Sequence, residues 1–112
     1  MTLREKQSLF ALLVAELIRH AATLGYAVTF GEAYRSPEEA ARLAKLGKGI
    51  KNSLHTQRLA IDLNLFKDGK YLSSTESHRP LGEWWESVHP WCAWGGRFKD
   101  GNHYSLEHEG RK

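Results

Sequence analysis

The chain contains little cysteine, and this limits the cross-links and sites that it can form. Cys92 is the only cysteine among the 112 residues, so neither a disulfide framework nor a thiolate zinc cluster can form within the chain. No apolar run approaches the roughly 18 residues of a membrane-spanning helix, and charged residues interrupt the apolar stretch near the N-terminus. A signal peptide needs an unbroken apolar region. We therefore expect cytoplasmic synthesis and no stable membrane insertion.

The chain also lacks a strong excess of charge of either sign. It carries 16 Lys and Arg residues against 13 Asp and Glu residues, for a formal net charge of +3. This mild basic bias suits an anionic partner, such as a cell-wall polymer, a nucleic acid or a membrane surface, without identifying one. Binders of single-stranded nucleic acid combine basic side chains with stacking aromatic ones, and the sequence shows no such stripe. We expect no nucleic-acid partner.

The composition that remains is typical of a globular protein, with 41% hydrophobic and 26% charged residues. Helices are expected over residues 3–24, 37–46 and 80–88. Thr2 and Glu5 have the spacing of a capping box, and Ser36 and Pro37 are typical of an N-cap and a first helical turn. On the third helix, Trp84 and its neighbour are better explained by packing against a sheet than by lining a pocket.

Strands alternate with these helices. They are expected over residues 26–34, over residues 59–65 and from residue 103 onward, with a hairpin turn at residues 67–70. In the second strand, apolar side chains alternate strictly, which indicates one buried face. The alternating residues are Leu59, Ile61, Leu63 and Leu65. Asp62 therefore lies on the opposite, polar face.

The polar face of this strand is a candidate metal site. His55 and Asp62 are seven residues apart, so they cannot share a face of one continuous strand, and His55 must precede the strand. His103 begins another strand on its polar face, with Asp100 three residues before it. Two imidazoles and one carboxylate, from His55, His103 and Asp62, would give the three protein ligands of a hydrolytic zinc ion.

Two further side chains have the chemistry that such a site needs. Zinc lowers the pKa of bound water to roughly 7, and Asp100 could serve as the general base that accepts the proton. Arg35 lies at a strand-to-helix corner, where it could stabilise an oxyanion or form a salt bridge with a nearby acid. The spacing alone also fits a solvated strand face with scattered histidines, so the residues by themselves leave both interpretations open.

Longer motifs resemble those of a known family. The segment Ser53-x-His55-x-x-Arg58-x-Ala60-x-Asp62 resembles the Ser-x-His-x-x-Gly-x-Ala-x-Asp motif of the M15 zinc peptidases. The segment Trp94-Gly95-Gly96…Phe98-x-Asp100-x-x-His103-Tyr104 is similar to the second block of that family, and Tyr34-Arg35-Ser36 to the segment that carries its anion-binding arginine. The three blocks stand in the family's order and span about residues 25–108.

The resemblance implies roles for these residues. Zinc would be bound by His55, Asp62 and His103, Asp100 would be the catalytic base, and Arg35 would bind substrate or stabilise the transition state. Ser53 would help to shape the substrate site, and Arg58, which replaces the motif glycine, would contact substrate. The implied fold is α+β, with helices packed on a small antiparallel sheet as in hedgehog and DD-peptidase domains, and it agrees with the expected segments.

From this resemblance we expect a single zinc peptidase domain over residues 1–112, acting as a monomer on peptidoglycan stem peptides. An aspartate base resembles the phage endopeptidase branch more than the carboxypeptidases. The expected reaction is therefore hydrolysis of the L-Ala–D-Glu bond by a phage or prophage endolysin, which reaches the cell wall after release and lyses the host. Two alternatives stay open: a D-Ala-D-Ala carboxypeptidase, and a non-catalytic module that binds cell-wall peptides.

Overall fold

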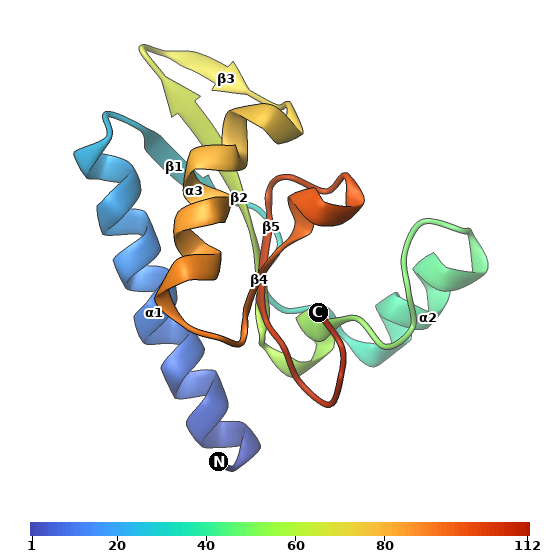
Figure 1. Cartoon of the computed structure of the whole chain (residues 1–112). Coiled ribbons are helices and arrows are strands. Elements are labelled where there is room, and N and C mark those ends of the chain that lie inside the picture. Colours follow the sequence, from blue (N-terminus) through green and yellow to red (C-terminus); the bar gives the residue numbers. More distant parts are fainter.

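One antiparallel sheet, with two helices on one of its faces, forms the body of the molecule (Figure 1). The computed structural model describes all residues from 1 to 112. The helices are α1 (Leu3–Thr23), α2 (Pro37–Lys45) and α3 (Thr75–Val88), with short 3-10 turns η1 (Leu54–Gln57) and η2 (Gly95–Phe98). The strands are β1 (Ala27–Phe30), β2 (Ala60–Lys67), β3 (Lys70–Leu72), β4 (Cys92–Trp94) and β5 (His103–Leu106). None of the helices has the length and apolar content needed to cross a membrane.

The strand order β1-β2-β5-β4 places β2 and β5 side by side at the centre of the sheet, with β3 also paired to β2. Asp62 on β2 is the register partner of His103 on β5, so their side chains point to the same face. The neighbouring residues Leu63 and Tyr104 point to the other face and are fully buried. The sheet therefore has one apolar face and one face that carries the candidate ligands.

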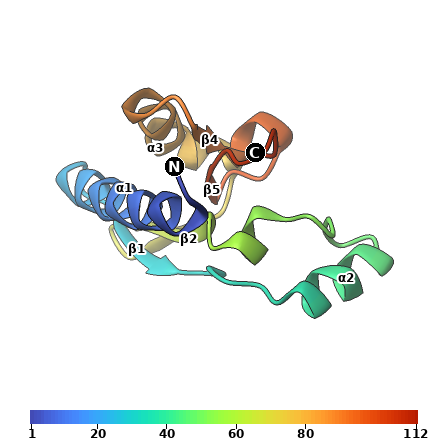
Figure 2. The same cartoon turned by 90° about the horizontal axis from the view of Figure 1, so that it is seen from below.

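Helix α1 covers the apolar face of the sheet, and it has the start that its sequence predicts. The capping box at its start is present, because the Thr2 hydroxyl accepts from the Glu5 amide at 3.1 Å and the Glu5 carboxylate accepts from the Thr2 amide at 2.8 Å. Its buried stripe consists of Phe10, Val14, Leu17 and Ala21. Figure 2 shows α1 and α3 together on one side of the sheet. This arrangement leaves the opposite face of β2 and β5 available for a site.

Helix α3 begins five residues earlier than the sequence predicts. The Ser74 hydroxyl caps it by accepting from the Ser77 amide at 3.1 Å, and Pro80 lies inside the helix rather than at its start. As the sixth residue of α3, Pro80 lacks the amide that would donate to the Glu76 carbonyl oxygen, so the helix forms there without one of its internal hydrogen bonds. The expected packing role of the tryptophans is confirmed at Trp85, which is fully buried and donates to the carbonyl oxygens of Ala93 and Ser105.

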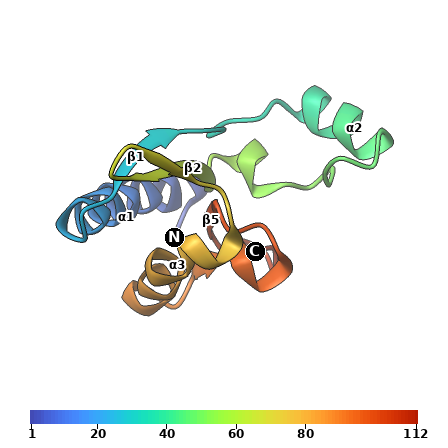
Figure 3. The ribbon, with the colours of Figure 1, turned by 90° about the horizontal axis from the view of Figure 1, so that it is seen from above.

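The first strand is shorter than predicted, because β1 ends at Phe30. The Gly31 amide donates to the Asp62 carbonyl oxygen and the Asp62 amide donates to the Glu32 carbonyl oxygen, both at 2.8 Å. Gly31 and Glu32 on one strand thus both pair with Asp62 on the other, which is the pattern of a β-bulge. A bulge bends the strand, and it leads the chain away from the sheet toward α2. Figures 2 and 3 both show α2 standing apart from the sheet body.

Candidate metal and catalytic site

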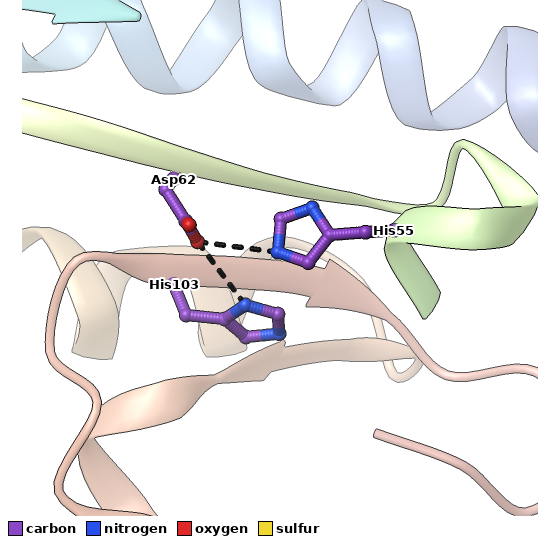
Figure 4. Close-up of side chains that lie close together, drawn as sticks. All are labelled: His55, Asp62 and His103. Atoms are coloured by element: carbon purple, nitrogen blue, oxygen red, sulfur yellow. Dashed lines mark hydrogen bonds and ion pairs between the residues drawn. The ribbon is translucent and has the colours of Figure 1, made fainter. Parts of the chain in front are cut away.

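Three elements bring two histidines and an aspartate together on the polar face of the sheet (Figure 4). His55 comes from η1, Asp62 from β2 and His103 from β5. One Asp62 oxygen, Oδ1, lies 3.3 Å from His55 Nε2 and 3.3 Å from His103 Nδ1. The candidate ligand atoms of the three residues all lie within 4.8 Å of one another. The structure therefore places together the three residues that the sequence predicts as zinc ligands.

The turn η1 fixes the position and the tautomer of His55. The Ser53 hydroxyl caps this turn by accepting from the His55 amide at 3.2 Å. His55 Nδ1 lies 3.0 Å from the Ala33 carbonyl oxygen. A carbonyl oxygen can only accept, so Nδ1 carries the proton. Nε2 then donates to Asp62 when the imidazole is charged, and it is free to bind a metal when the imidazole is neutral. Metal-binding histidines are commonly oriented by such a bond.

The charges of the cluster are coupled. Burial favours the neutral form of Asp62, but hydrogen bonds from His103 and His55 outweigh burial and lower its pKa to about 2. Burial disfavours the charged imidazole of His55, yet its bonds to Asp62 and to the Ala33 carbonyl oxygen raise its pKa overall. A single carboxylate thus stays ionised between two imidazoles, which is a cation-binding arrangement.

The donor set and its spacing fit a zinc ion. Tetrahedral zinc binds nitrogen and oxygen at about 2.0–2.1 Å, which places neighbouring ligand atoms roughly 3.3–3.4 Å apart. Both contacts of Asp62 Oδ1 with the histidine nitrogens measure 3.3 Å. Two neutral imidazoles and one carboxylate also match the ligand types of catalytic zinc sites, which keep one position open.

Asp100 stands beside the cluster without joining it. Its Oδ2 lies 3.9 Å from His103 Nδ1, and its side chain is 54% exposed. Partial burial, together with the nearby charge of Asp62, raises the pKa of Asp100 despite the opposing effect of His103. A carboxylate with a raised pKa, next to the ligands and open to solvent, has the position and the basicity expected of a general base.

The position of Asp100 depends on Gly95 at the start of η2. The Asp100 amide donates to the Gly95 carbonyl oxygen at 2.9 Å, and the Asp100 carbonyl oxygen accepts from the His103 amide at 3.1 Å. A Cβ atom at residue 95 would lie 2.2 Å from the Asp100 carbonyl oxygen and 2.7 Å from His103 Cβ. Only glycine permits this close approach, so Gly95, in the family-like Trp94-Gly95 pair, allows Asp100 and His103 to lie close together.

Arg35 forms the salt bridge that the sequence left open as an alternative. Its guanidinium donates to Glu32 Oε1 from Nε at 3.0 Å and from Nη2. Its side chain is only 14% exposed, and the Glu32 bond raises the pKa of Arg35 despite partial burial. Sequence reasoning missed Glu32. The sequence does contain a signal for this salt bridge, because Glu32 is an acid that lies three residues before Arg35 in a predicted strand.

The candidate residues share one cavity, with a single exception. A cavity of about 270 Å³ is lined by His55, Asp62, His103, Asp100, Arg35 and Ser53, together with residues of the loop after α2 and of η2. Arg58 lines a separate, apolar cavity of about 450 Å³ against α1. There its guanidinium lies 4.1 Å from the ring centroid of Tyr34. The larger cavity lacks the acids and imidazoles that hydrolysis needs, so we identify the smaller, polar one as the candidate site.

Comparisons with known proteins agree with this geometry. The crystal structure of Serratia marcescens L-Ala D-Glu endopeptidase ChiX is similar to this chain, with a TM-score of 0.63 and 21% sequence identity. The similarity covers 85% of this chain and 77% of that one, and it confirms the predicted α+β fold. No curated protein sequence matches the chain. A family model described as D-alanyl-D-alanine carboxypeptidase matches residues 47–106 and includes all three candidate ligands and Asp100. Since this match covers more than half of the sequence, the chain belongs to the M15 peptidase family.

Proposed function

We propose that this protein is a zinc-dependent peptidoglycan peptidase that hydrolyses an amide bond of the stem peptide. The observation that carries the proposal is the cavity in which three residues that could hold a metal ion, an exposed acid and an arginine meet. Membership of a peptidase family supports hydrolysis of a peptide bond. The similar fold of an L-Ala D-Glu endopeptidase supports the L-Ala–D-Glu bond as the target. We also propose that the protein acts as a phage or prophage endolysin, because an aspartate base resembles that of the phage endopeptidases.

Each residue of the site has a defined task in this reaction. Zinc, held by His55, Asp62 and His103, would act as a Lewis acid and make water acidic enough to yield a nucleophile near neutral pH. Asp100 accepts the proton of the attacking water and then donates it to the leaving amine. Arg35 donates a hydrogen bond to the carbonyl oxygen as negative charge develops on it. The Ala33 carbonyl keeps His55 in the tautomer that leaves Nε2 free to bind metal.

The alternative target is the D-Ala-D-Ala bond. The description of the matching family model favours this carboxypeptidase reaction. The two reactions give different products, because a carboxypeptidase releases a terminal D-Ala whereas the endopeptidase separates the stem from its L-Ala. Mass spectrometry of purified peptidoglycan fragments, digested with and without a chelator, distinguishes them. Digestion that continues unchanged after the metal is removed would rule out a zinc enzyme.

The role of Asp100 is tested by substitution. Asp100→Asn keeps the size of the side chain but removes the base, so peptidoglycan hydrolysis should fall by at least about 100-fold. Zinc content should stay near that of the wild type, because Asp100 lies outside the ligand cluster. Asp68→Asn, in the turn between β2 and β3, is the matched control. Near-normal hydrolysis by Asp100→Asn would refute the catalytic assignment.

A further inference from the structure

Two lysines have no task in the proposed mechanism, although they line the cavity of the site. They are Lys48, from the loop after α2, and Lys112. The same cavity is lined by the triad of His55, Asp62 and His103. The acids at the site do not neutralise the lysines, because their ion pairs are with the histidines and with Arg35. Both lysines are therefore available to an anionic group of the substrate.

Arg35 is not available in the same way, because its charge is already paired. Its Nε and Nη2 atoms both donate to Glu32 Oε1. The proposed mechanism assigns the remaining donors of Arg35 to the carbonyl oxygen of the scissile bond. A further anionic group of the substrate therefore needs a different cation.

The proposed substrate carries such a group on the residue that follows the scissile bond. Glutamate has two carboxyl groups, and the stem peptide continues through only one of them, so the D-Glu residue keeps a free carboxylate. In the proposed mechanism Asp100 serves the leaving amine of this same residue. The two negative charges repel each other, so a cation beside the substrate carboxylate would offset the repulsion. We therefore looked for a cation that the protein holds close to the scissile carbonyl group.

The end of α2 fixes the backbone of Lys48. Gly47 follows the last turn of the helix with a φ of 70°, and its amide donates to the Ala44 carbonyl oxygen at 3.1 Å. The Lys48 amide donates to the Leu43 carbonyl oxygen at 2.9 Å. These two bonds form a Schellman motif, which satisfies the last carbonyl groups of a helix. Lys48 thus begins the next loop from a defined position.

This loop passes beside the arginine of the site. A Cβ atom at Gly49 would lie 3.4 Å from Arg35 Nη1, and Gly49 lines the cavity together with Lys48. The Lys48 residue is exposed, and its flexible side chain carries a compact charge. Because Arg35 addresses the scissile carbonyl group in the proposed mechanism, we expect the carboxylate of the next residue to lie within reach of Lys48.

Lys112 is less suited to this role. It also lines a neighbouring cavity of about 290 Å³ together with two acids, Glu86 and Glu107. Carboxylates of the protein in the same cavity compete with a substrate carboxylate for the charge of Lys112. The cation to assign is therefore Lys48.

We propose that Lys48 is a substrate-binding residue that pairs with the free carboxylate of the D-Glu residue after the scissile bond. This inference rests on the proposed function and deepens it, because it names the group of the stem peptide that the protein recognises. Lys48 makes the protein selective for stems in which this carboxyl group is free over stems in which it is amidated. Amidation removes the charge while it changes the size of the group very little.

Binding measurements test this selectivity without relying on turnover. In the zinc-loaded Asp100→Asn protein, the Kd is measured for two synthetic stem-peptide fragments that contain L-Ala–D-Glu, one with the free carboxylate and one with its primary amide. The free acid should bind more tightly. Adding Lys48→Met should reduce this preference by about three- to fivefold, near the upper limit for an ion pair that is open to solvent. An unchanged preference would overturn the inference.

Controls separate this pairing from general effects of charge and folding. Lys48→Met should fold normally, because an apolar residue commonly occupies this position of a Schellman motif, and Lys48→Arg should keep the preference. Lys45→Met is the matched control, because Lys45 is exposed at the end of α2 and does not line the cavity. An equal loss of preference in Lys45→Met, or a loss in Lys112→Met but not in Lys48→Met, would overturn the inference.

The proposed function is tested separately by the wild-type enzyme. If the wild type cleaves no peptidoglycan fragment, the proposed function fails, while the binding of the two fragments still decides the role of Lys48. If the wild type is an active endopeptidase and Lys48→Met keeps the full preference for the free acid, only the inference about Lys48 fails.

Discussion

Arg58 shows how a single residue can depart from a family motif and still fit the fold. It stands where the motif has glycine, and its backbone has a φ of 56°, in the left-handed region. A non-glycine residue there costs about 1–2 kcal/mol. Stacking on Tyr34 recovers roughly 0.5–1 kcal/mol. The departure therefore reflects a local exchange of backbone strain for a side-chain contact, outside the cavity that holds the triad.

Substitution of Arg58 by glycine should change stability little. The variant loses the contact with Tyr34 and gains freedom in the unfolded chain, but it relieves the strained backbone. These effects are similar in size, so the free energy of unfolding should change by less than about 1 kcal/mol. Urea denaturation measures it. A loss above about 2 kcal/mol would show that the stacking contributes more than this comparison allows.

His78 should make stability depend on pH. It is buried, and burial lowers its pKa below the ordinary value. Above about pH 6.5 the imidazole is neutral in both the folded and the unfolded state. As the pH falls below this value, the unfolded chain binds the proton more readily, so the free energy of unfolding decreases until the pH reaches the folded-state pKa. The slope contributed by this one group is at most about 1.4 kcal/mol per pH unit.

Urea denaturation at several values between pH 7 and pH 5 measures this slope. His78→Asn keeps a polar side chain near the Tyr104 hydroxyl, which His78 Nδ1 contacts at 2.8 Å, but it cannot titrate. The variant should show a flatter dependence on pH than the wild type, whatever its absolute stability. Equal slopes would assign the pH dependence to other groups.

At the scale of single residues, the sequence predicted which titratable side chains meet in the cavity but not all of their contacts. His55, Asp62, His103 and Asp100 could be named because their chemistry and spacing follow motifs. Glu32 could not, since its significance depends on a bulge that aligns it with Asp62. A bulge is decided by hydrogen bonds between strands distant in sequence, and these leave no periodic pattern.

At the scale of elements, η2 connects β4 to β5 and sets the separation of Asp100 from His103. Gly95→Ala should force the turn apart, because the added Cβ would lie 2.2 Å from the Asp100 carbonyl oxygen. We expect a loss of stability of about 1–3 kcal/mol and a clear loss of zinc affinity, measured by competition with a coloured chelator below the melting temperature.

Gly82→Ala provides the matched comparison. Its added Cβ would lie 2.0 Å from the Trp94 ring, in the packing between α3 and β4. It should destabilise the fold to a similar degree while leaving zinc affinity close to that of the wild type. Equal losses of zinc affinity in both variants would mean that the site responds to general destabilisation rather than to the turn.

The elements that were predicted well are those with strong local signals. Helix α1 has a capping box and a regular apolar stripe, and the hairpin between β2 and β3 has an Asp68-Gly69 turn. Strand β4 was missed because its three residues are too few to show alternation. The sequence predicts that α3 begins at Pro80, whereas the helix begins at Thr75 with Ser74 as its cap.

For the whole molecule, the fold should outlast the loss of metal. The apolar core joins α1, α3 and the sheet and does not include the triad. Zinc at 100 times its Kd would add about 2.7 kcal/mol to stability, which corresponds to a melting temperature higher by on the order of 10 °C for a chain of this size. Chelation should therefore lower the melting temperature by this amount while the far-ultraviolet circular dichroism at 25 °C stays unchanged. Unfolding on chelation would contradict this expectation.

The segment from Arg35 to His55 forms an arm that carries α2, and the two ends of this arm lie close together. The Arg35 amide donates to the His55 carbonyl oxygen at 3.2 Å, although about twenty residues separate them, and Figure 3 shows the intervening chain extending away from the body. Doubling the length of a closed loop costs only about 0.6 kcal/mol. The arm can therefore be lengthened, shortened or exchanged as a cassette while arginine and ligands keep their places, so substrate range can be redesigned here without rebuilding the catalytic centre.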